Sequence, residues 1–489
     1  MIFDVELVLL IPIITALICF ISPKEGIVTW ISIIGSALGL VAVLALCLPI
    51  FLNGTVTEYG AWYVDGLSAL FMMITSVVAL MVSLYSQGYL RTEREEKLLT
   101  LRSEKHYYVF LNLFVAIMLS VFVVSSLGLL WIIIEATTLI STFLVGFYRN
   151  EKSTEAAWKY LIICSVGITL ALIGISIIYA STVGLVTDES SALNWPVLMS
   201  IASQLDPVLM KTAMVLIIIG FGTKVGFAPM HTWLPDAHSQ APTPISALLS
   251  ATLLNCALYG ILRFTLISEI TIPGFATTLL LIFGFLSLAV AAAFILISKD
   301  IKRMLAYSSI ENMGIISIGF GLGTSMSIFA ALFMVLAHSM TKPILFFVAG
   351  NIIQQYGTKE MASIRGLKKK MPFTSTMLIV GTMAIVGMPV FAVFIGEITI
   401  LYSAIDAGMW WMTVIIVILL LIVFAGFILH IFPMIGGDTE KDVHDPKSIV
   451  RALPLVVLAG ITLFFGLFMP NDIMNGFEMI VNNIFRGML

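Results

Sequence analysis

Long apolar runs repeat along the whole chain and leave it few folds to adopt. Each run approaches the roughly 20 residues that a helix needs to cross about 30 Å of hydrocarbon. The fourteen runs cover residues 3–22, 27–51, 63–86, 107–126, 128–148, 158–182, 208–230, 243–267, 273–297, 303–322, 326–353, 373–402, 409–433 and 451–470. Lipid offers backbone groups no hydrogen-bond partners, so each run must satisfy its own backbone, as a helix does. The sequence therefore predicts an all-α, polytopic membrane protein.

Composition agrees with this fold class and excludes several functions. Hydrophobic residues make up 60% of the chain and charged residues 11%, whereas soluble domains average about 25% charged residues. The net charge of −3 argues against a nucleic-acid-binding surface. The longest polar loop, residues 87–106, is too short for a soluble domain, and no GxGxxG, P-loop or CxxC motif is present. We therefore expect no cofactor, metal ion or redox centre in this chain.

Basic residues occur in alternate loops, which predicts the orientation of the chain in a membrane. The basic loops contain Lys24, Arg91, Arg94, Lys97, Arg102, Lys105, Arg149, Lys152, Lys299, Lys302, Arg303, Lys359, Arg365, Lys368, Lys369, Lys370, Lys441, Lys447 and Arg451. The opposite loops, such as 52–62, 183–207, 268–272 and 403–408, have no Lys or Arg. By the positive-inside rule the basic loops face the cytoplasm and both termini face outward.

The two ends of the chain have their own sequence features. Asp4 and Glu6 stand where a signal peptide would carry basic residues, so we expect the first apolar run to remain as a helix. The last segment, 471–489, has apolar residues at helical spacing and predicts a short amphipathic helix on the outer surface. These apolar residues are Phe477, Ile480, Val481, Ile484 and Phe485.

Six ionisable residues inside the expected spans stand out. They are Glu135, Lys224, Glu311, His338, Lys342 and Glu397. A charge at the middle of a membrane helix costs about 2.5–3.5 kcal/mol on insertion scales, so such a residue is a functional candidate by default. A structural hydrogen bond is the alternative for Glu135 and Glu311, and a satisfied core residue is the alternative for His338.

Helix-breaking residues accompany three of these charges. Four prolines follow Lys224, at positions 229, 235, 242 and 244, and predict a discontinuous helix that lines a wet cavity. Pro343 directly follows Lys342 and predicts a second break. Gly387 and Pro389 precede Glu397 and predict a third. We also expect Glu135 to pair with Lys224, since each charge lowers the other's desolvation cost and a pair that opens and closes is a proton switch.

The broken spans at 208–230 and 373–402 are five crossings apart and so run in opposite directions, which is the parity of an inverted repeat. The predicted organisation is an N-terminal part (1–106), a first five-helix repeat (107–267), a second five-helix repeat (268–434) and a C-terminal part (435–489). His231 and His238, with Asp236, follow the first break. We expect them either to shape that turn or to take up protons.

Several motifs carry a family resemblance over nearly the whole chain. The run TKVGFAPMHTWLPDAHSQAPTPISALL, with WIIIE, KDIKRMLAYSSIENMG, HSMTKPILFFVAGNI and GMPVFAVFIGE, resembles the proton-translocating antiporter-like subunits of respiratory complex I, Mrp-type antiporters and membrane-bound hydrogenases. SIENMG, HSMTKPILFFVAGN and the length of 489 residues without a long lateral helix look most like the F-type subunit of hydrogenase-4 and formate hydrogenlyase complexes.

The resemblance implies roles for the charged residues. Glu135 and Lys224 match the family's ion pair, and Glu397 matches its terminal acid. His338 and Lys342 match its relay. The expected path takes a cytoplasmic proton past His238 to Lys224, by way of the relay, and out through Glu397.

Three positions depart from the family pattern. Asn255 and Ser250 stand where relatives have a lysine or a histidine, and Asn312 stands beside Glu311 where a histidine can occur. Because these three side chains do not change charge, the resemblance implies that water held by them carries the proton there, with Glu311 as a substitute carrier.

The resemblance implies an antiporter-like subunit of a redox-driven proton pump in a prokaryotic plasma membrane. No residue of this chain releases the energy for pumping, so a nickel–iron centre and iron–sulfur clusters are expected in partner subunits. Those partners would be peripheral hydrogenase-like subunits, beside other antiporter-like membrane subunits. Two alternatives remain open: a subunit of an Mrp-like antiporter that exchanges sodium for protons, and an inactive structural spacer.

Overall fold

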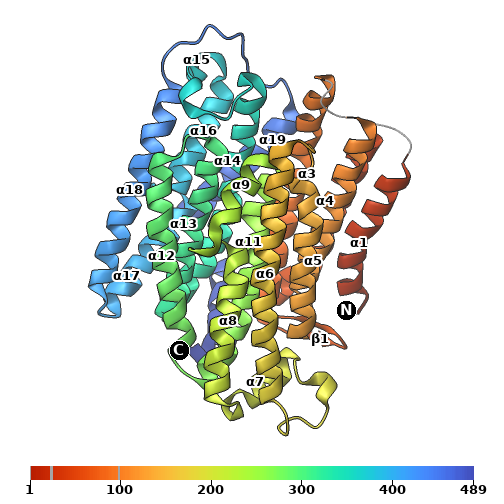
Figure 1. Ribbon diagram of the computed structural model, residues 1–489, viewed down its shortest axis with the longest axis vertical. Helices are drawn as coiled ribbons and strands as arrows, with labels where there is room; N and C mark the ends of the chain where they lie inside the picture. The colour runs from red at the N-terminus through yellow and green to blue at the C-terminus, as the bar shows by residue number, and fades with distance from the viewer. Residues whose placement is uncertain (1, 23–25, 97–99, 489) are drawn as a thin grey trace.

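The computed structural model describes residues 2–22, 26–96 and 100–488. Long helices run side by side along one direction and form a bundle (Figure 1). Both ends of the chain lie at one end of this bundle, together with β1 and α7, and α15 lies at the other end. Lys24 and Lys97, assigned above to basic loops, lie outside the described residues.

The first part of the chain contains six long helices and one hairpin. Its elements are α1 (Ile2–Ile21), α2 (Ile27–Asn53), β1 (Thr57–Tyr59), β2 (Trp62–Val64), α3 (Gly66–Glu95), α4 (Leu101–Val121), α5 (Leu127–Val145) and α6 (Glu151–Ser181). β1 and β2 pair antiparallel, with Glu58 opposite Tyr63. The hairpin joins α2 to α3 outside the long helices.

The remaining elements include the expected helix interruptions. The middle of the chain forms α7 (Trp195–Ile201), α8 (Pro207–Val225), α9 (Trp233–Gln240), α10 (Thr243–Leu248), α11 (Leu254–Thr271), α12 (Phe275–Ile297) and α13 (Ile301–Leu322). The last part forms α14 (Ser325–Tyr356), α15 (Leu367–Lys370), α16 (Pro372–Ile385), α17 (Ala392–Asp406), α18 (Trp410–Ile435), α19 (Ile449–Leu467) and α20 (Asn471–Ile484).

The all-α membrane fold predicted from the sequence is confirmed. Among the described residues, ten helices or helix pairs are long and apolar enough to cross a membrane. The other four predicted spans coincide with α1, α4, α13 and the α16–α17 pair. The number of fourteen crossings and the two inverted repeats stay predictions.

The breaks at α8–α9 and α16–α17 occur where they were predicted. α8 ends at Val225, and Gly226 follows with φ 89°, a left-handed conformation that glycine adopts without a steric penalty. The second break contains Gly387 with φ 65° and Val390 with φ 80°. Both interruptions lie within predicted spans, so they bring helix ends into the interior of the bundle.

The break predicted at Pro343 is wrong. α14 runs as one helix from Ser325 to Tyr356 with Pro343 inside it. Proline removes only one N–H from the helical ladder, and close packing tolerates that loss, since most of α14 is buried in the bundle. The irregularity instead lies in a neighbouring span, where residues Leu249–Leu253 form a π-helical turn between α10 and α11. Such turns are rare and frequently lie at functional sites.

Burial separates a central layer from a lipid-facing one. Residues 254–269 of α11 and most of α14 are buried, including their polar side chains. The outer helices instead expose large apolar side chains, such as Trp410 at 66% and Ile449 at 84% of their surface. The bundle thus has an apolar outside and a partly polar centre, and polar groups inside a membrane protein mark candidate functional positions.

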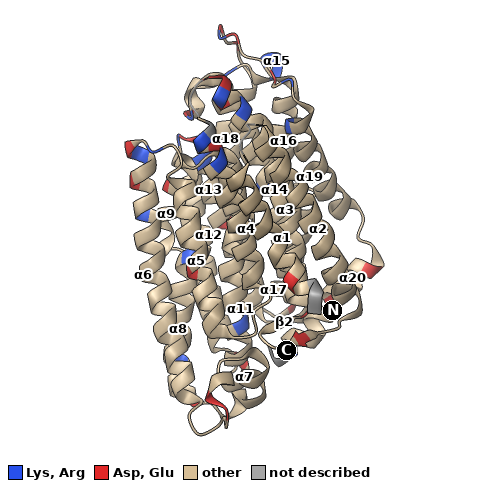
Figure 2. Ribbon diagram, turned by 90° about the vertical axis from the view of Figure 1, so that its right-hand side faces the viewer, with Lys and Arg blue, Asp and Glu red and all other residues tan. Residues whose placement is uncertain are grey.

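Basic residues are concentrated at one end of the bundle (Figure 2). Lys and Arg gather at the end that carries α15, opposite to the chain termini. This arrangement follows from the alternation of basic loops along the sequence. Which end faces the cytoplasm stays a prediction.

The C-terminal segment forms the predicted amphipathic helix, α20. Its apolar face packs on the bundle: the ring of Phe477 lies 5.5 Å from that of Phe51 and also contacts Phe329 and Phe333. Phe485 packs on Phe320 in the same way. Protein therefore covers most of the face that the sequence pattern assigned to the membrane surface.

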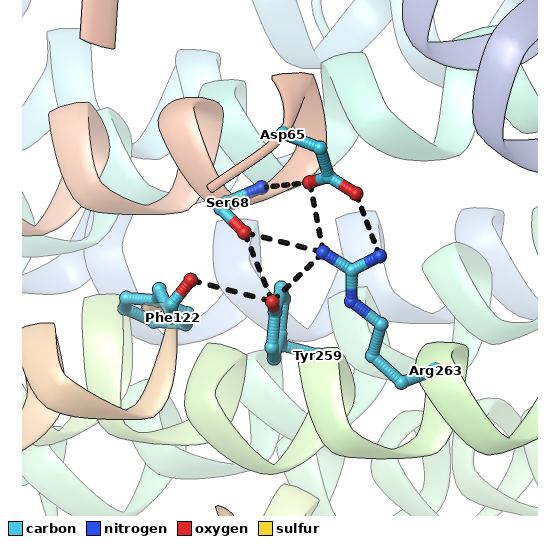
Figure 3. A network of polar contacts seen from close by, with 5 residues as sticks. All are labelled: Asp65, Ser68, Phe122, Tyr259 and Arg263. Atoms are coloured by element: carbon cyan, nitrogen blue, oxygen red, sulfur yellow. Dashed lines mark hydrogen bonds and ion pairs between the residues drawn. The ribbon is translucent and has the colours of Figure 1, made fainter. Parts of the chain in front are cut away.

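A buried ion pair fixes the end of the bundle near the hairpin (Figure 3). The guanidinium of Arg263 on α11 donates two hydrogen bonds, of 2.7 and 2.8 Å, to the carboxylate of Asp65, which caps α3. Arg263 also donates to the hydroxyls of Ser68 and Tyr259 and lies 4.6 Å from the ring centroid of Trp195. Each of these two buried charges therefore has both an oppositely charged partner and hydrogen bonds.

Replacing Asp65 with asparagine tests this pair. Asn retains a cap for α3 but removes the charge, and breaking a buried pair costs about 3–5 kcal/mol. The matched control is Asp206→Asn, because Asp206 caps α8 from an exposed position and Asn caps a helix as well as Asp does. We expect the midpoint of thermal unfolding in detergent, followed by tryptophan fluorescence, to fall clearly for D65N and little for D206N. Equal shifts would show that the ion pair adds nothing to the cap.

Candidate functional site

Lys224 lies at the first helix break and is fully buried. It belongs to the last turn of α8, where the negative end of the helix dipole favours a cation. Its ammonium donates to the carbonyl oxygen of Ile134, at 2.7 Å, and to the hydroxyl of Thr138. Both acceptors belong to α5. The lysine is thus held across the gap between two helices by neutral groups.

Glu135 lies beside these acceptors on α5 but does not pair directly with Lys224. Ser165 on α6 donates to one carboxylate oxygen of Glu135 at 2.7 Å, and Thr138 donates to the other at 3.3 Å. Among the residues that the structure describes, no ion pair within 4 Å joins Glu135 and Lys224. The predicted ion pair between Glu135 and Lys224 is therefore wrong. Instead, the hydroxyl of Thr138 contacts both side chains and bridges them.

Lys342 repeats the arrangement of Lys224 on another pair of helices, α14 and α13. Its ammonium donates to the carbonyl oxygen of Leu305, at 2.8 Å, and to the hydroxyl of Ser308, both on α13. The same helix carries Glu311, three residues after Ser308. Each buried lysine therefore binds a carbonyl and a hydroxyl of a helix that also carries a carboxylate.

The π-turn packs against the middle of α14. Nε2 of His338 lies 3.4 Å from the carbonyl oxygen of Ser250, and the Ser250 hydroxyl contacts that of Ser309 at 2.7 Å. Asn255 donates to Ser339, the neighbour of His338, at 2.9 Å. The structure thus brings together Ser250, Asn255 and His338, which the sequence placed in one relay.

We call the buried polar residues from Lys224 through Asn255, His338 and Lys342 to Glu397 the polar axis. Four buried polar atoms along this axis have no hydrogen-bond partner among the described residues. They are Oδ1 of Asn255, Nδ1 of His338, Oδ1 of Asn312 and Oε1 of Glu397. The amide of Asn312 meanwhile donates to Glu311 at 2.5 Å. Buried polar groups normally have a protein or water partner. These atoms therefore favour ordered water between the charged groups.

Glu397 lies at the second helix break. Its side chain belongs to α17, and one carboxylate oxygen lies so close to Gly387 that a Cβ there would be 1.9 Å away. Glu311 is also a buried carboxylate, on α13, which packs against α17. Its place in the relay stays a prediction.

The two histidines after the first break differ in their surroundings. His238 on α9 is fully buried, stacks on Phe346 at 5.3 Å, and has no hydrogen-bond partner on either ring nitrogen among the described residues. His231 lies near the rings of Phe294 and Tyr307. Neither histidine is therefore held in place by a hydrogen bond from its ring to another described residue.

Polar and charged side chains surround the part of α9 that contains His238, at the end of the bundle where the basic loops lie. Ser239 donates to Asp300 at 2.7 Å, while Lys359 and Lys302 donate to the carbonyl oxygens of Ser239 and Ala241. Burial lowers the pKa of Lys359, which lies in the loop after α14, although Asp300 opposes the shift. Charged groups thus approach the α9 segment from the end of the bundle where the basic loops lie.

Several side chains that complete these contacts were not predicted from the sequence. They are Thr138, Ser165, Ser308, Ser309, Ser339, Asp65 and Arg263. Thr138 and Ser308 each lie three residues from a carboxylate on the same helix, a spacing that could have revealed them. Arg263 lies inside a predicted span and could have been counted with the other charges there. Ser165 has no signal in its local sequence.

The side chains of this axis include proton donors and acceptors. The described residues contain no group of three or more His, Cys, Asp or Glu side chains that could hold a metal ion. The four cysteines are buried and free. The chemistry that this axis offers is proton exchange among lysine, glutamate, histidine and hydroxyl groups.

Comparison with known proteins matches most of the chain to characterised families. Residues 124–423 match the sequence profile described as "NADH:quinone oxidoreductase/Mrp antiporter, TM", and residues 54–97 match "NADH-Ubiquinone oxidoreductase (complex I), chain 5 N-terminus". The chain is 36% identical over 418 residues to a hydrogenase-4 component F homolog from Methylacidiphilum infernorum, covering 85% of this chain and 87% of the relative.

Further similarity extends to an antiporter and to a solved complex. The chain is 31% identical to an Na+/H+ antiporter subunit from Alkalihalophilus pseudofirmus, covering 84% of this chain and 52% of that one. Its fold matches a chain of the archaeal membrane-bound sulfane sulfur reductase with a TM-score of 0.87, at 23% identity and 99% coverage of both chains.

The contact between Gly387 and Glu397 can be tested with alanine. Gly387→Ala adds backbone strain of about 1 kcal/mol and also displaces the carboxylate of Glu397. Gly408→Ala is the matched control, because Gly408 has φ 74° and nothing within 4 Å of an added Cβ. We expect G387A to lower the thermal midpoint more than G408A does. In a Glu397→Ala background the two glycine substitutions should cost the same, and an excess loss that persists there would contradict this contact.

Proposed function

This chain belongs to the NADH:quinone oxidoreductase/Mrp antiporter membrane family, and we propose that it translocates protons as an antiporter-like subunit of a complex I-related redox complex. The similarity to a hydrogenase-4 component F homolog favours a complex of the hydrogenase-4 or formate hydrogenlyase type. In such a complex this chain would carry the protons, while other subunits would carry the electrons.

The observation that carries the proposal is the pair of matched lysine sites. Lys224 and Lys342 are both fully buried, and each is held by neutral acceptors rather than by a direct carboxylate contact. A buried lysine with neutral acceptors is stable enough to exist in the interior but gains or loses its proton more readily than an ion-paired one. Two such lysines on one polar axis are suited to pass a proton from one to the other.

The proposed path follows this axis. A proton would approach through the cluster around His238, reach Lys224 as the Thr138 bridge to Glu135 rearranges, and pass over water near Asn255 and His338 to Lys342. It would leave by way of Glu311 and Glu397. The unpartnered atoms of Asn255, His338, Asn312 and Glu397 support water as the carrier in the gaps. Imidazole suits a central position because its unperturbed pKa lies near neutrality.

Partner subunits would supply the energy. Moving one charge against 100 mV requires about 2.3 kcal/mol. The proposed sources are a nickel–iron centre and iron–sulfur clusters in peripheral subunits, linked to this chain through further membrane subunits. The proposed switch is the link from Glu135 through Thr138 to Lys224, because a movement of α5 changes all of its hydrogen bonds together.

The orientation and internal symmetry belong to the same proposal. We place the basic loops in the cytoplasm of a prokaryotic cell and both termini outside, since Lys and Arg gather at the end opposite to the termini. We treat residues 107–267 and 268–434 as inverted repeats. The similar acceptors of Lys224 and Lys342 and the breaks at α8–α9 and α16–α17 support this division.

Sodium/proton exchange is the second candidate, and the 31% identity to the Na+/H+ antiporter subunit from Alkalihalophilus pseudofirmus favours it. In that case the same axis would carry protons against a sodium flow supported by other subunits. A structural spacer is less suited to these observations, because a spacer needs neither buried lysines nor unpartnered polar atoms along its centre.

Replacing Lys224 with alanine tests the proposal. In proteoliposomes that contain the purified complex, we expect K224A to lower proton uptake, followed by quenching of a pH-sensitive dye, by about tenfold or more while electron transfer continues. Lys211→Ala is the matched control, because Lys211 lies on the same helix in an exposed position. Normal proton uptake by K224A would refute the proposed path. Uptake that requires sodium and no electron donor would instead establish the exchanger.

The hydroxyl of Thr138 provides a second test. Thr138→Val removes an acceptor from Lys224 and a donor to Glu135, and an unsatisfied buried polar group costs about 1–3 kcal/mol. We expect T138V to slow proton uptake by about tenfold and Thr138→Ser to restore most of it. Thr142→Val is the control one turn along α5, where the hydroxyl bonds only to the carbonyl of Thr138. Equal effects of T138V and T142V would argue against a bridge.

A further inference from the structure

A cavity of about 620 Å³ lies among α4, α5 and α6 at the basic end of the bundle. Arg102, His106 and Arg149 line it together with the aromatic side chains of Phe143 and Trp158. The proton axis described above uses none of these residues. The cavity therefore has a chemistry of its own, with both cationic and aromatic side chains in its lining.

The two arginines of the cavity have no acidic partner among the described residues. Both are exposed, and among residues 2–22, 26–96 and 100–488 no carboxylate lies within ion-pair distance of Arg102 or Arg149. Arg149 adopts φ 53°, a left-handed conformation that is uncommon for residues other than glycine. Elsewhere at this end the basic residues Arg94, Arg303 and Lys369 do contact carboxylates. The cavity thus presents two guanidinium groups that can bind an anion.

The aromatic residues that line the cavity lie at the lipid-facing surface. Phe143 and Trp158 are 60% and 58% exposed, and the ring of Phe110 stacks on Phe143 at 5.1 Å. Ile162, one turn from Trp158 on α6, is also exposed. Tryptophan is enriched where a membrane helix meets the headgroup layer. An occupant of this cavity would therefore have an anionic part near the arginines and an apolar part along these rings.

We propose that this cavity binds an anionic phospholipid from the leaflet at the basic end of the bundle. The guanidinium groups of Arg102 and Arg149 hold the phosphate, because arginine donates paired hydrogen bonds to phosphate oxygens. One acyl chain follows Phe143, Trp158 and Leu161 toward the middle of the membrane. A volume of 620 Å³ lies within the range of small-molecule sites, about 300–1,000 Å³. A free phosphate ion would leave the aromatic residues uncovered.

The bound lipid packs against α5, the helix whose Ile134 and Thr138 accept hydrogen bonds from Lys224. Thr142, Phe143 and Gly146 of the cavity belong to α5 or its C-terminal cap, and the hydroxyl of Thr142 donates to the carbonyl oxygen of Thr138 at 2.7 Å. Lipid at this position therefore contacts α5 one turn from the acceptor of Lys224. The binding site itself does not depend on the proposed proton transport, because only the cavity and its side chains define it.

The first experiment measures lipid retained by the purified complex. Native mass spectrometry in mild detergent, with phosphatidylglycerol added, compares the wild type with the Arg102→Gln/Arg149→Gln variant. The control is Lys368→Gln/Lys370→Gln, which removes the same charge from the same end of the chain outside the cavity. We expect the arginine variant to retain about tenfold less phosphatidylglycerol, with no change for the control or for zwitterionic phosphatidylethanolamine. Equal retention by both variants would overturn the proposal.

A second measurement leaves both arginines in place, so it does not depend on how the variant folds. A photoreactive phenylalanine derivative replaces Trp158 in the complete complex, and light then links it to whatever occupies the cavity mouth. An adduct with the mass of an anionic phospholipid supports the proposal. A crosslink to another protein would show that a partner chain covers the cavity, and adducts that match the bulk lipid composition would show only annular lipid; either result overturns the proposal.

Discussion

The hydrogen-bonding of buried ammonium groups is the interaction on which this structure depends. A lysine in the interior of a membrane protein carries a large desolvation cost, and Lys224 and Lys342 meet it in the same way, with one carbonyl and one hydroxyl each. A carbonyl inside a helix already accepts one hydrogen bond but has a second lone pair to offer. The neighbouring helices α5 and α13 must therefore present a hydroxyl next to an accessible carbonyl. Thr138 and Ser308 meet that requirement, which explains why hydroxyl residues occur at these places in otherwise apolar helices.

Helix breaks and the buried ion pair give the lysine sites a fixed frame. The end of α8 places Lys224 in a last helical turn, where the dipole favours its charge. The break before α17 leaves room at Gly387 for the carboxylate of Glu397. At the opposite end from the basic loops, Arg263 and Asp65 join α11 to α3 through paired hydrogen bonds. Since α11 continues directly from the π-turn that contains Ser250, this pair anchors one end of the helix that lines the centre of the axis.

Much of the fold was predictable because membrane helices leave strong local signals. Length and apolarity gave the spans, and glycine with proline gave the breaks after α8 and α16. Pro343 shows the limit of the same reasoning, since one missing N–H did not interrupt the buried helix α14. The charged site residues were also predictable, because charge is rare in such a sequence. Their partners were not: Asp65 and Arg263 are far apart in the sequence, and whether Glu135 touches Lys224 or reaches it through Thr138 depends on helix spacing that no local pattern specifies.

Asparagine and serine at the centre of the axis favour a particular kind of conduction. Ser250, Asn255 and Asn312 offer hydrogen bonds but cannot store a charge, so a proton cannot rest on them. The side chains that can hold a proton are their neighbours Lys224, His338, Lys342, Glu311 and Glu397. On the path proposed above, a proton would move from Lys224 by way of His338 to Lys342 along water held by these side chains. Each transfer would need a charged donor and a neutral acceptor, so a change at Glu135 would act on the first transfer through the Thr138 bridge.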